Sequence, residues 1–262
     1  MDQRKDGPPV PRGDVVAGRN AVRELLLSGK SVDRVFAARG DGKLAEIVAL
    51  AKEAGVPVID AERSKLDAMC PGVPHQGVAA VAAAHEFASI EDVLALAEER
   101  GEKPLIAICD GVEDPHNLGA IIRCAECAGA HGVVIPKRRS VGLNATVAKA
   151  SAGAVEYVPV VRVSNIPELI EKLKKSGVWV YAAEAGGSPY YDTDLDRPAA
   201  IVFGSEGRGV SDLAKKRCDG VISIPLYGKI NSLNVSAAAA VLLTHAAVSQ
   251  REGGADNAKK IK

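Results

Sequence analysis

The chain has 262 residues, of which 47% are hydrophobic and 25% charged, and this is the composition of a globular protein with a full core. Its 33 basic and 33 acidic residues give a formal net charge of zero, so the overall charge does not indicate a nucleic-acid partner. No apolar run reaches about 18 residues, and the start lacks the apolar stretch of a signal peptide. We therefore expect a cytoplasmic protein of one large or two smaller domains, with no membrane partner.

The five cysteines do not fall into the paired spacings of a metal site. Cys124 and Cys127 form one C-x-x-C in the middle of a predicted helix, where buried thiols are the favoured interpretation. The acidic residues do not cluster as a magnesium site requires. We expect no metal.

The first half of the chain predicts a small domain. Residues 1–13 are polar and rich in proline, which predicts a disordered leader. Residues 14–84 then alternate helical and strand patterns, and their length is near the lower limit for independent folding. We expect helices over 20–27, over 43–54 and around Leu66, and strands over 32–38, over 56–59 and in the second half of 71–83.

Residues 85–103 read as a linker that contains one helix, over 90–99. A second domain is predicted over 104–250, followed by a disordered tail over 251–262. Its strands are expected at 105–109, 133–135, 155–160, 178–183, 201–203 and 221–224, with helical patterns between them. In the first of these connections Asn117 is placed as a helix N-cap. Strand and helix alternating in this way predict an α/β domain with a parallel sheet covered on both faces.

Two loops organise this second domain. Gly204 ends one predicted strand and opens the loop GSEGRG, and Pro225 ends the next and opens a loop that runs to an alanine-rich helix. If these strands are parallel neighbours, both loops open at the same edge of the sheet, where open α/β sheets bind ligands. The loops would then form a pocket made mostly of backbone.

Other glycine-loop sites fit these residues poorly. A dinucleotide site needs G-x-G-x-x-G, whereas this loop is G-x-x-G-x-G and lacks an acidic residue about 20 positions on. A nucleophile elbow needs G-x-S-x-G, and no G-x-x-x-x-G-K-[ST] phosphate loop exists. Tight packing of a strand against a helix is the remaining alternative.

The words FGSEGRG and IPLYGKINSLNVS resemble the second and third motifs of the SpoU (TrmH) family of RNA ribose methyltransferases, and DGVEDPHNLGAIIRCAECAGAHGVVIP resembles the first. In the first half, VAGRNAVRELL and HQGVAA resemble the RNA substrate-binding domain that precedes the catalytic domain in part of this family. The resemblance implies a small α/β domain followed by a parallel-sheet domain of the SPOUT type, whose last segments form a trefoil knot. For His75, a turn-forming role and direct RNA contact both stay open.

The resemblance also implies a site. The S-adenosylmethionine positions are Gly204, Ser205, Gly209, Ile224, Leu226 and Leu233. The catalytic positions are Asn117, Arg123, Glu206, Ser232 and Asn234. Structural alternatives exist for each: Asn117 and Asn234 as helix caps, and Arg123 with Glu206 as an ordinary ion pair.

A guanidinium is almost never neutral in a protein, so we do not expect Arg123 to be the base. Arg123 would instead grip the adjacent phosphate and stabilise charge on the ribose oxygen, while the phosphate or a water takes the proton. Glu206 would orient Arg123. Ser232 and Asn234 would position the ribose and the donor.

The two-domain layout resembles the members that methylate a guanosine of 23S ribosomal RNA. The alternatives are a transfer RNA ribose 2′-O-methyltransferase of the same family, a nucleotide-dependent α/β enzyme of the dehydrogenase type, and a non-catalytic RNA-binding protein. The family also implies a homodimer in which the closing helix packs at a two-fold interface and each active site borrows from its neighbour.

Overall fold

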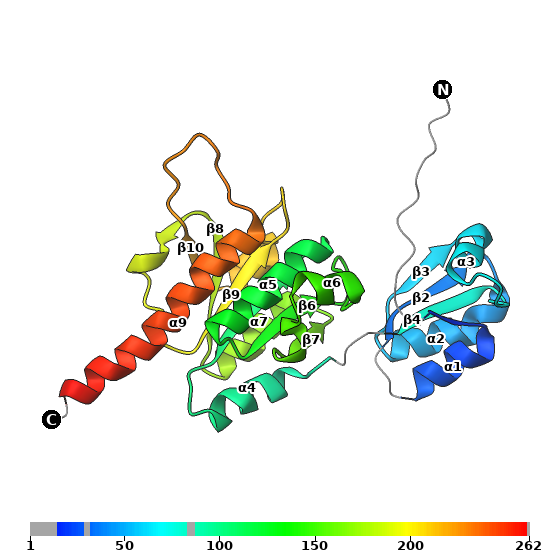
Figure 1. Ribbon diagram of the computed structural model, residues 1–262, viewed down its shortest axis with the longest axis horizontal. Helices are drawn as coiled ribbons and strands as arrows, with labels where there is room; N and C mark the ends of the chain where they lie inside the picture. Colours follow the sequence, from blue (N-terminus) through cyan, green and yellow to red (C-terminus); the bar gives the residue numbers. More distant parts are fainter. Residues whose placement is uncertain (1–14, 29–31, 83–86, 261–262) are drawn as a thin grey trace. The chain divides into compact units, whose positions relative to one another are not determined.

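The computed structural model describes residues 15–28, 32–82 and 87–260 (Figure 1). The chain divides into two compact units, one over 1–86 with 142–145 and the other over 87–141 with 146–262. The predicted leader over 1–13 lies outside the described residues. We refer to the two parts as the amino-terminal and carboxy-terminal units.

The amino-terminal unit is a four-stranded mixed sheet with three α-helices. Its strands are β1 (Val15–Ala17), β2 (Val32–Ala38), β3 (Val58–Ala61) and β4 (Val78–Ala82), in the order β1-β4-β2-β3. Its helices are α1 (Arg19–Leu27), α2 (Ala45–Glu53) and α3 (Arg63–Met69). β2 and β3 are parallel, whereas β4 runs antiparallel to both β1 and β2. The unit buries its own apolar cluster, which includes Val35, Phe36, Leu44 and Leu66.

The carboxy-terminal unit is built on a six-stranded sheet in which every neighbouring pair is parallel, in the order β10-β8-β9-β5-β6-β7. The strands are β5 (Leu105–Asp110), β6 (Gly132–Pro136), β7 (Val160–Val163), β8 (Trp179–Pro189), β9 (Ala199–Gly204) and β10 (Gly220–Ser223). The prediction of a strand over 155–160 is wrong, because a 3-10 turn covers Ala154–Glu156. β7 begins only after Pro159, whose missing N–H cannot join a ladder.

Helices cover both faces of this sheet (Figure 1). α4 (Ile90–Glu99), α7 (Ile166–Lys175) and α8 (Asp212–Arg217) bury their apolar side chains in one cluster with strand residues such as Ile106, Val134 and Val202. α5 (Pro115–Ala128) and α9 (Val235–Lys260) pack on each other and on β5, and α6 (Ala145–Ala150) follows β6 in the chain. Strands buried on both faces explain the continuous apolar runs in the sequence.

The linker that we predicted contains helix α4, and this helix is part of the carboxy-terminal core. The Ser89 side chain caps it by accepting from the Asp92 N–H at 3.1 Å, and Asp92 accepts from the Ser89 N–H in return. Val93 is fully buried and lies so close to Gly132 that a Cβ on that glycine would meet it at 2.6 Å. The helix of the linker therefore contributes to the stability of the second unit.

Three details differ from the expectations. β9 and β10 are not neighbours, because β8 lies between them and pairs with both. The N-cap of α5 is Asp114, which accepts from the His116 N–H at 2.9 Å, so Asn117 lies in the first turn. α9 continues to Lys260, past the predicted end of the domain at residue 250, since no proline interrupts this segment.

His131 forms a hydrogen bond with the first residue of β5. It is 2% exposed, its Nδ1 accepts the Leu105 N–H at 3.1 Å, and its Nε2 lies 3.0 Å from a carboxylate oxygen of Glu102. Burial lowers the pKa of the imidazole, although the Glu102 carboxylate acts in the opposite direction. Because Nδ1 accepts a hydrogen bond, the neutral form of His131 that fits this contact carries its proton on Nε2.

The prediction of buried thiols is wrong for Cys127, which is exposed, and Cys124 is only half-buried. Cys124 lies at the edge of the buried side of α5, where its Sγ donates to the Ser236 carbonyl oxygen at 3.8 Å, whereas Cys127 lies outside that side. Burial does raise the pKa of Cys109 and of Cys218, each to about 12.

Candidate active site

Two cavities open at the carboxyl edge of the parallel sheet in the carboxy-terminal unit. The first has a volume of about 570 Å³ and lies among the middle of β8, the ends of β9 and β10, and the segments that follow β9 and β10. Its lining includes all six predicted donor positions, Gly204, Ser205, Gly209, Ile224, Leu226 and Leu233, and three predicted catalytic residues, Glu206, Ser232 and Asn234. We call this the donor cavity.

The donor cavity fits a nucleoside joined to a small polar chain. Ile222, Ile224 and Leu242 supply apolar surface for a flat base, while the turn over 204–209 exposes backbone groups that read polar atoms. Gly207 and Gly209 have φ of 85° and 67°, so this turn requires residues that accept the left-handed region. The residues present therefore suit S-adenosylmethionine.

Gly204 allows close backbone packing in the turn after β9. A Cβ at this position would overlap backbone atoms of Gly209 and Val210 rather than enter the cavity. Across the same turn Ser205 and Gly209 exchange backbone hydrogen bonds, Ser205 N–H to Gly209 O at 3.1 Å and Gly209 N–H to Ser205 O at 3.0 Å. The absent side chain lets the turn fold back on the end of β9.

One charged pair in the donor cavity is not predicted from the sequence. Glu184 on β8 lines the cavity, and both of its carboxylate oxygens accept from Lys215 Nζ, at 2.9 and 3.0 Å. The hydrogen bond to Glu184 raises the pKa of Lys215. The lysine cluster at the end of α8 indicates only a helix-dipole role, and nothing in the sequence places Glu184 opposite it.

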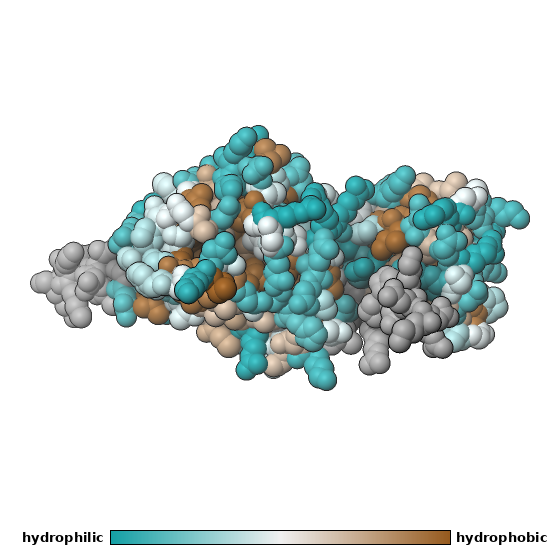
Figure 2. Space-filling view, turned by 90° about the horizontal axis from the view of Figure 1, so that it is seen from above, coloured by the Kyte–Doolittle hydropathy of each residue, from teal (hydrophilic) through white to brown (hydrophobic). Residues whose placement is uncertain are grey.

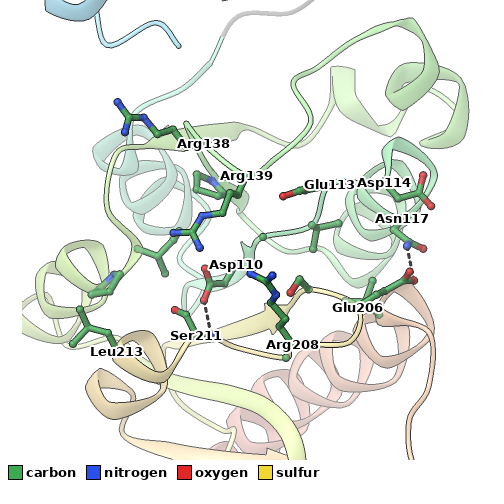
Figure 3. Close-up of a pocket in the computed structure, with 18 of the residues that line it drawn as sticks. Asp110, Glu113, Asp114, Asn117, Arg138, Arg139, Glu206, Arg208, Ser211 and Leu213 are labelled. Atoms are coloured by element: carbon green, nitrogen blue, oxygen red, sulfur yellow. Dashed lines mark hydrogen bonds between the residues drawn. The ribbon is translucent and has the colours of Figure 1, made fainter. Parts of the chain in front are cut away.

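The second cavity has a volume of about 1010 Å³ and is lined by the segments that follow β5, β6, β7 and β9 (Figure 3). We call it the polar cleft. It shares Ser205, Glu206, Gly209 and Val235 with the donor cavity, so the turn after β9 is the wall between the two. Asn117 lines the polar cleft from the first turn of α5.

Asn117, Glu206 and Asn234 join in one hydrogen-bonded triad at this wall. Glu206 Oε1 accepts from Asn117 Nδ2 at 2.8 Å and from Asn234 Nδ2 at 3.2 Å. Asn234 Nδ2 also donates to Asn117 Oδ1 at 2.9 Å, and Asn234 Oδ1 accepts from the Ser236 N–H at 2.9 Å. One residue from each of the three motifs thus meets at a single point, although 117 positions separate Asn117 from Asn234 in the chain.

Arg123 lies outside the Asn117–Glu206–Asn234 triad. It is exposed on α5, lines neither the donor cavity nor the polar cleft, and has no hydrogen bond or ion pair with any residue that the structure describes. The expectation that Glu206 orients Arg123 is wrong for the single chain, because the Glu206 carboxylate is held by two amides. Arg123 lies six positions beyond Asn117, which on a helix is about 240° of rotation and about 9 Å along the axis.

Comparison with known proteins agrees with the arrangement. Residues 104–244 match the model of the SpoU rRNA Methylase family, and residues 15–88 match that of the domain described as RNA 2′-O ribose methyltransferase substrate binding. The chain belongs to the SpoU rRNA methylase family. It is also 45% identical over 233 residues, which is 88% of this chain and 93% of the relative, to YacO of Bacillus subtilis (strain 168), named for the TrmH family of tRNA/rRNA methyltransferases.

Solved structures show the same fold. The SpoU methyltransferase AviRb from Streptomyces viridochromogenes, in complex with AdoMet, has a TM-score of 0.57 at 24% identity, over 91% of this chain and 90% of AviRb. A TrmH/SpoU tRNA modifying enzyme from A. aeolicus has a TM-score of 0.52 at 26% identity, over 63% of this chain and 85% of its own. The SPOUT-type fold is thereby confirmed, and the trefoil knot stays a prediction.

Membership in the SpoU family confirms the enzyme class: this chain is an RNA methyltransferase that takes its methyl group from S-adenosylmethionine. Membership in this family excludes the alternative of a nucleotide-dependent enzyme of the dehydrogenase type. In the described part of the chain, no helix has the length and apolar character to cross a membrane. The same residues contain no group of three or more His, Cys, Asp or Glu side chains placed to hold a metal ion.

Proposed function

We propose that this SpoU-family enzyme methylates the ribose 2′-hydroxyl of a nucleotide in structured RNA, and that its target is a guanosine of 23S ribosomal RNA. The observation that carries the proposal is the Asn117–Glu206–Asn234 triad, which stands between a cavity suited to the donor and a polar cleft large enough for a nucleotide. A group in the cleft and a group in the donor cavity can then approach each other across Glu206.

S-adenosylmethionine, when bound, supplies a methyl group on a positively charged sulfur. The residues of the chain have to present the hydroxyl in line with it and exclude competing water. Glu206 Oε1 is occupied by the two amides, whereas its Oε2 has no hydrogen bond to any residue that the structure describes. Glu206 Oε2 is therefore available to accept the hydrogen bond of the ribose hydroxyl and orient its oxygen. Ser232, exposed on the donor-cavity side, is placed to position the donor.

Arg123 completes the site, by this proposal, from a second copy of the chain. Its guanidinium is exposed and has no partner among the described residues of the single chain, as a group that serves a neighbouring molecule would be. There it stabilises charge that develops on the ribose oxygen, and the phosphate or a water takes the proton.

An apolar surface supports the homodimer. The loop before α9 and α9 itself expose large apolar side chains: Leu226, Tyr227, Ile230, Leu233, Val241 and Val248. Figure 2 shows apolar side chains gathered on the visible face of the carboxy-terminal unit. Exposed apolar patches of this kind mark protein interfaces. Light scattering should give twice the single-chain mass of 27.2 kDa, and a monomer at micromolar concentration would contradict the proposal.

The amino-terminal unit is proposed to choose the RNA, in line with the substrate-binding family that it matches. His75 is only 9% exposed, and both ring nitrogens are engaged, Nδ1 by the Gly77 N–H at 3.0 Å and Nε2 by Asp67 at 3.0 Å. These contacts favour the turn-forming role of His75 over direct RNA contact. A cytoplasmic location, where ribosomal RNA is accessible, belongs to the same proposal.

Mass spectrometry of ribosomal and transfer RNA from a strain that lacks the gene tests the substrate. Loss of one 2′-O-methylguanosine from 23S ribosomal RNA, restored by the wild-type gene and not by an Asn234→Ala variant, is the expected result. Transfer RNA stays as the second candidate because YacO is named for both RNAs. A nucleoside missing only from transfer RNA would overturn the ribosomal assignment.

A further inference from the structure

The polar cleft has a cationic side that the reaction described so far does not use. Arg138 and Arg139 come from the segment after β6, and Arg208 comes from the turn that separates the cleft from the donor cavity. Figure 3 shows Arg138 and Arg139 on the side away from Asp114 and Asn117, with Arg208 between them and Glu206. The cleft therefore presents guanidinium groups toward one side and the triad toward the other.

These three arginines have no partner among the residues that the structure describes. All are exposed, and none forms a hydrogen bond or ion pair with a described residue. By contrast, two carboxylates of the cleft are already engaged by backbone: Asp110 accepts the Ser211 N–H at 2.8 Å and Asp114 caps α5. Glu206 receives the two amides, which leaves Glu113 as the cleft carboxylate without such a bond in the described part of the chain. The cationic side is thus open to an external anion.

The backbone at Arg139 adds an independent observation. Its φ is 55°, in the left-handed region that arginine rarely adopts. Such a conformation is strained for a residue that has a side chain, and strained residues gather at functional sites where the surroundings hold them in place. Glycine would adopt this φ without strain, which makes Arg139 a candidate for such a functional position.

We propose that Arg138, Arg139 and Arg208 bind phosphates of the RNA strand on either side of the target nucleotide. The inference rests on the proposed function, and it deepens it by assigning the strand's position in the cleft. With the phosphates on the arginine side, the ribose between them lies toward Asn117 and Glu206. Arginine suits this role because its planar fork donates two parallel hydrogen bonds to one phosphate.

The test compares RNA binding by the full-length protein and by Arg139→Gly, Arg208→Gln and their double variant. Arg139→Gly removes the cation, and glycine accepts the φ of 55° at this position, so the substitution introduces no backbone strain. An unchanged Tm then shows that weaker binding by this variant does not come from misfolding. Arg100→Gln is the matched control, since Arg100 is exposed at the end of α4 and lines neither cavity. The probes are protein-free 23S ribosomal RNA and a transfer RNA transcript, titrated over a series of salt concentrations with the demethylated donor product present.

Each single variant should bind RNA about 3- to 10-fold more weakly than wild type. Its slope of log affinity against log salt should be shallower by about 0.7–0.9 for each phosphate that the missing arginine no longer neutralises. The double variant should show about twice this change in slope, and Arg100→Gln none. Calorimetry should show donor-product affinity within about 2-fold of wild type for every variant, since these side chains lie on the cleft side of the wall.

An unchanged salt slope in the double variant would overturn the assignment, and so would a wild-type affinity that does not depend on salt. These outcomes are separate from the failure of the proposed function. If wild type methylates neither RNA while the variants still reduce the slope, the substrate proposal fails and the assignment of the arginines to phosphates stands.

Discussion

Gly204→Ala should disable the donor cavity by breaking its wall rather than by occupying its space. The added Cβ would lie far closer to backbone atoms of Gly209 and Val210 than the 3.4–4 Å of an ordinary van der Waals contact. Backbone cannot rotate away as the end of a side chain does, so the turn has to move. Gly207→Ala is the control from the same turn: unlike Gly204, Gly207 has a positive φ, of 85°, and its Cβ would meet nothing within 4 Å.

The magnitude follows from the bonds across the turn. Displacing Gly209 breaks its two backbone hydrogen bonds with Ser205, each worth about 1 kcal/mol net, and residual overpacking adds about 1–3 kcal/mol. Gly204→Ala should therefore destabilise the carboxy-terminal unit by about 3–5 kcal/mol. At about 2–4 °C per kcal/mol, its Tm should fall by roughly 6–20 °C. Gly207→Ala should cost about 1 kcal/mol, which is the strain of the left-handed region alone.

The assay is thermal unfolding combined with calorimetry of the demethylated donor product. Gly204→Ala should lose at least about 30-fold in affinity together with its Tm, while Gly207→Ala should stay within about 5-fold of wild type. A Gly204→Ala protein with the wild-type Tm and no donor binding would show that the side chain occupies ligand space instead. A protein with both properties unchanged would refute the packing role of Gly204.

Four further outcomes are expected. Glu206→Gln keeps the shape of the triad but not its charge, so the single-turnover methyl-transfer rate should fall about 10-fold, whereas Glu206→Ala should reduce it more than about 100-fold; equal rates in wild type and Glu206→Ala would contradict the role of the triad. Arg123→Ala should abolish transfer with donor affinity intact, and Arg123→Lys should not rescue it, because a point charge cannot replace a fork; a near-normal rate in the lysine variant would remove this assignment. Burial lowers the pKa of His131 in the folded protein, so the unfolded chain takes up the proton first as the pH falls. The Tm of the carboxy-terminal unit should therefore fall as the pH drops below about 6.5. His131→Asn should weaken this pH dependence of the Tm, and an unchanged dependence would contradict the role of His131. A fragment over 87–262 should fold and bind the demethylated donor product. A fragment over 101–262 should be less stable, because it lacks α4 and the core residues on this helix. Equal Tm values for the two fragments would show that α4 is dispensable.

Much of the fold is predictable from the sequence because local patterns decide it. The strand over 32–38 and the helix over 90–99 have the predicted bounds, since a turn or cap residue marks each end. The order of strands is not predictable in this way, because pairing depends on contacts between distant segments. β8 carries polar and glycine residues in its second half, so nothing in its composition predicts that it runs on to Pro189 and separates β9 from β10.

At the site, too, some features are predictable from the sequence and others depend on contacts between distant segments. The six residues predicted to bind the donor line one cavity, and their contact with the donor stays a prediction. Within the single chain Glu206 is held by two amides and not by Arg123, and no sequence pattern predicts these amide contacts. Arg208 is not predicted at all, because a residue in a glycine-rich turn has no pattern that tells which cavity its side chain lines.

The turn over 205–209 belongs to both cavities, and a shared wall has a thermodynamic consequence. Whichever ligand arrives first restricts the motion of this turn, so the second ligand loses less conformational entropy when it binds. Such coupling is reciprocal by necessity: the factor by which the donor tightens RNA binding equals the factor by which RNA tightens donor binding. After transfer the demethylated product occupies the same cavity against the same wall. We therefore expect its release and the release of the modified RNA to be linked steps.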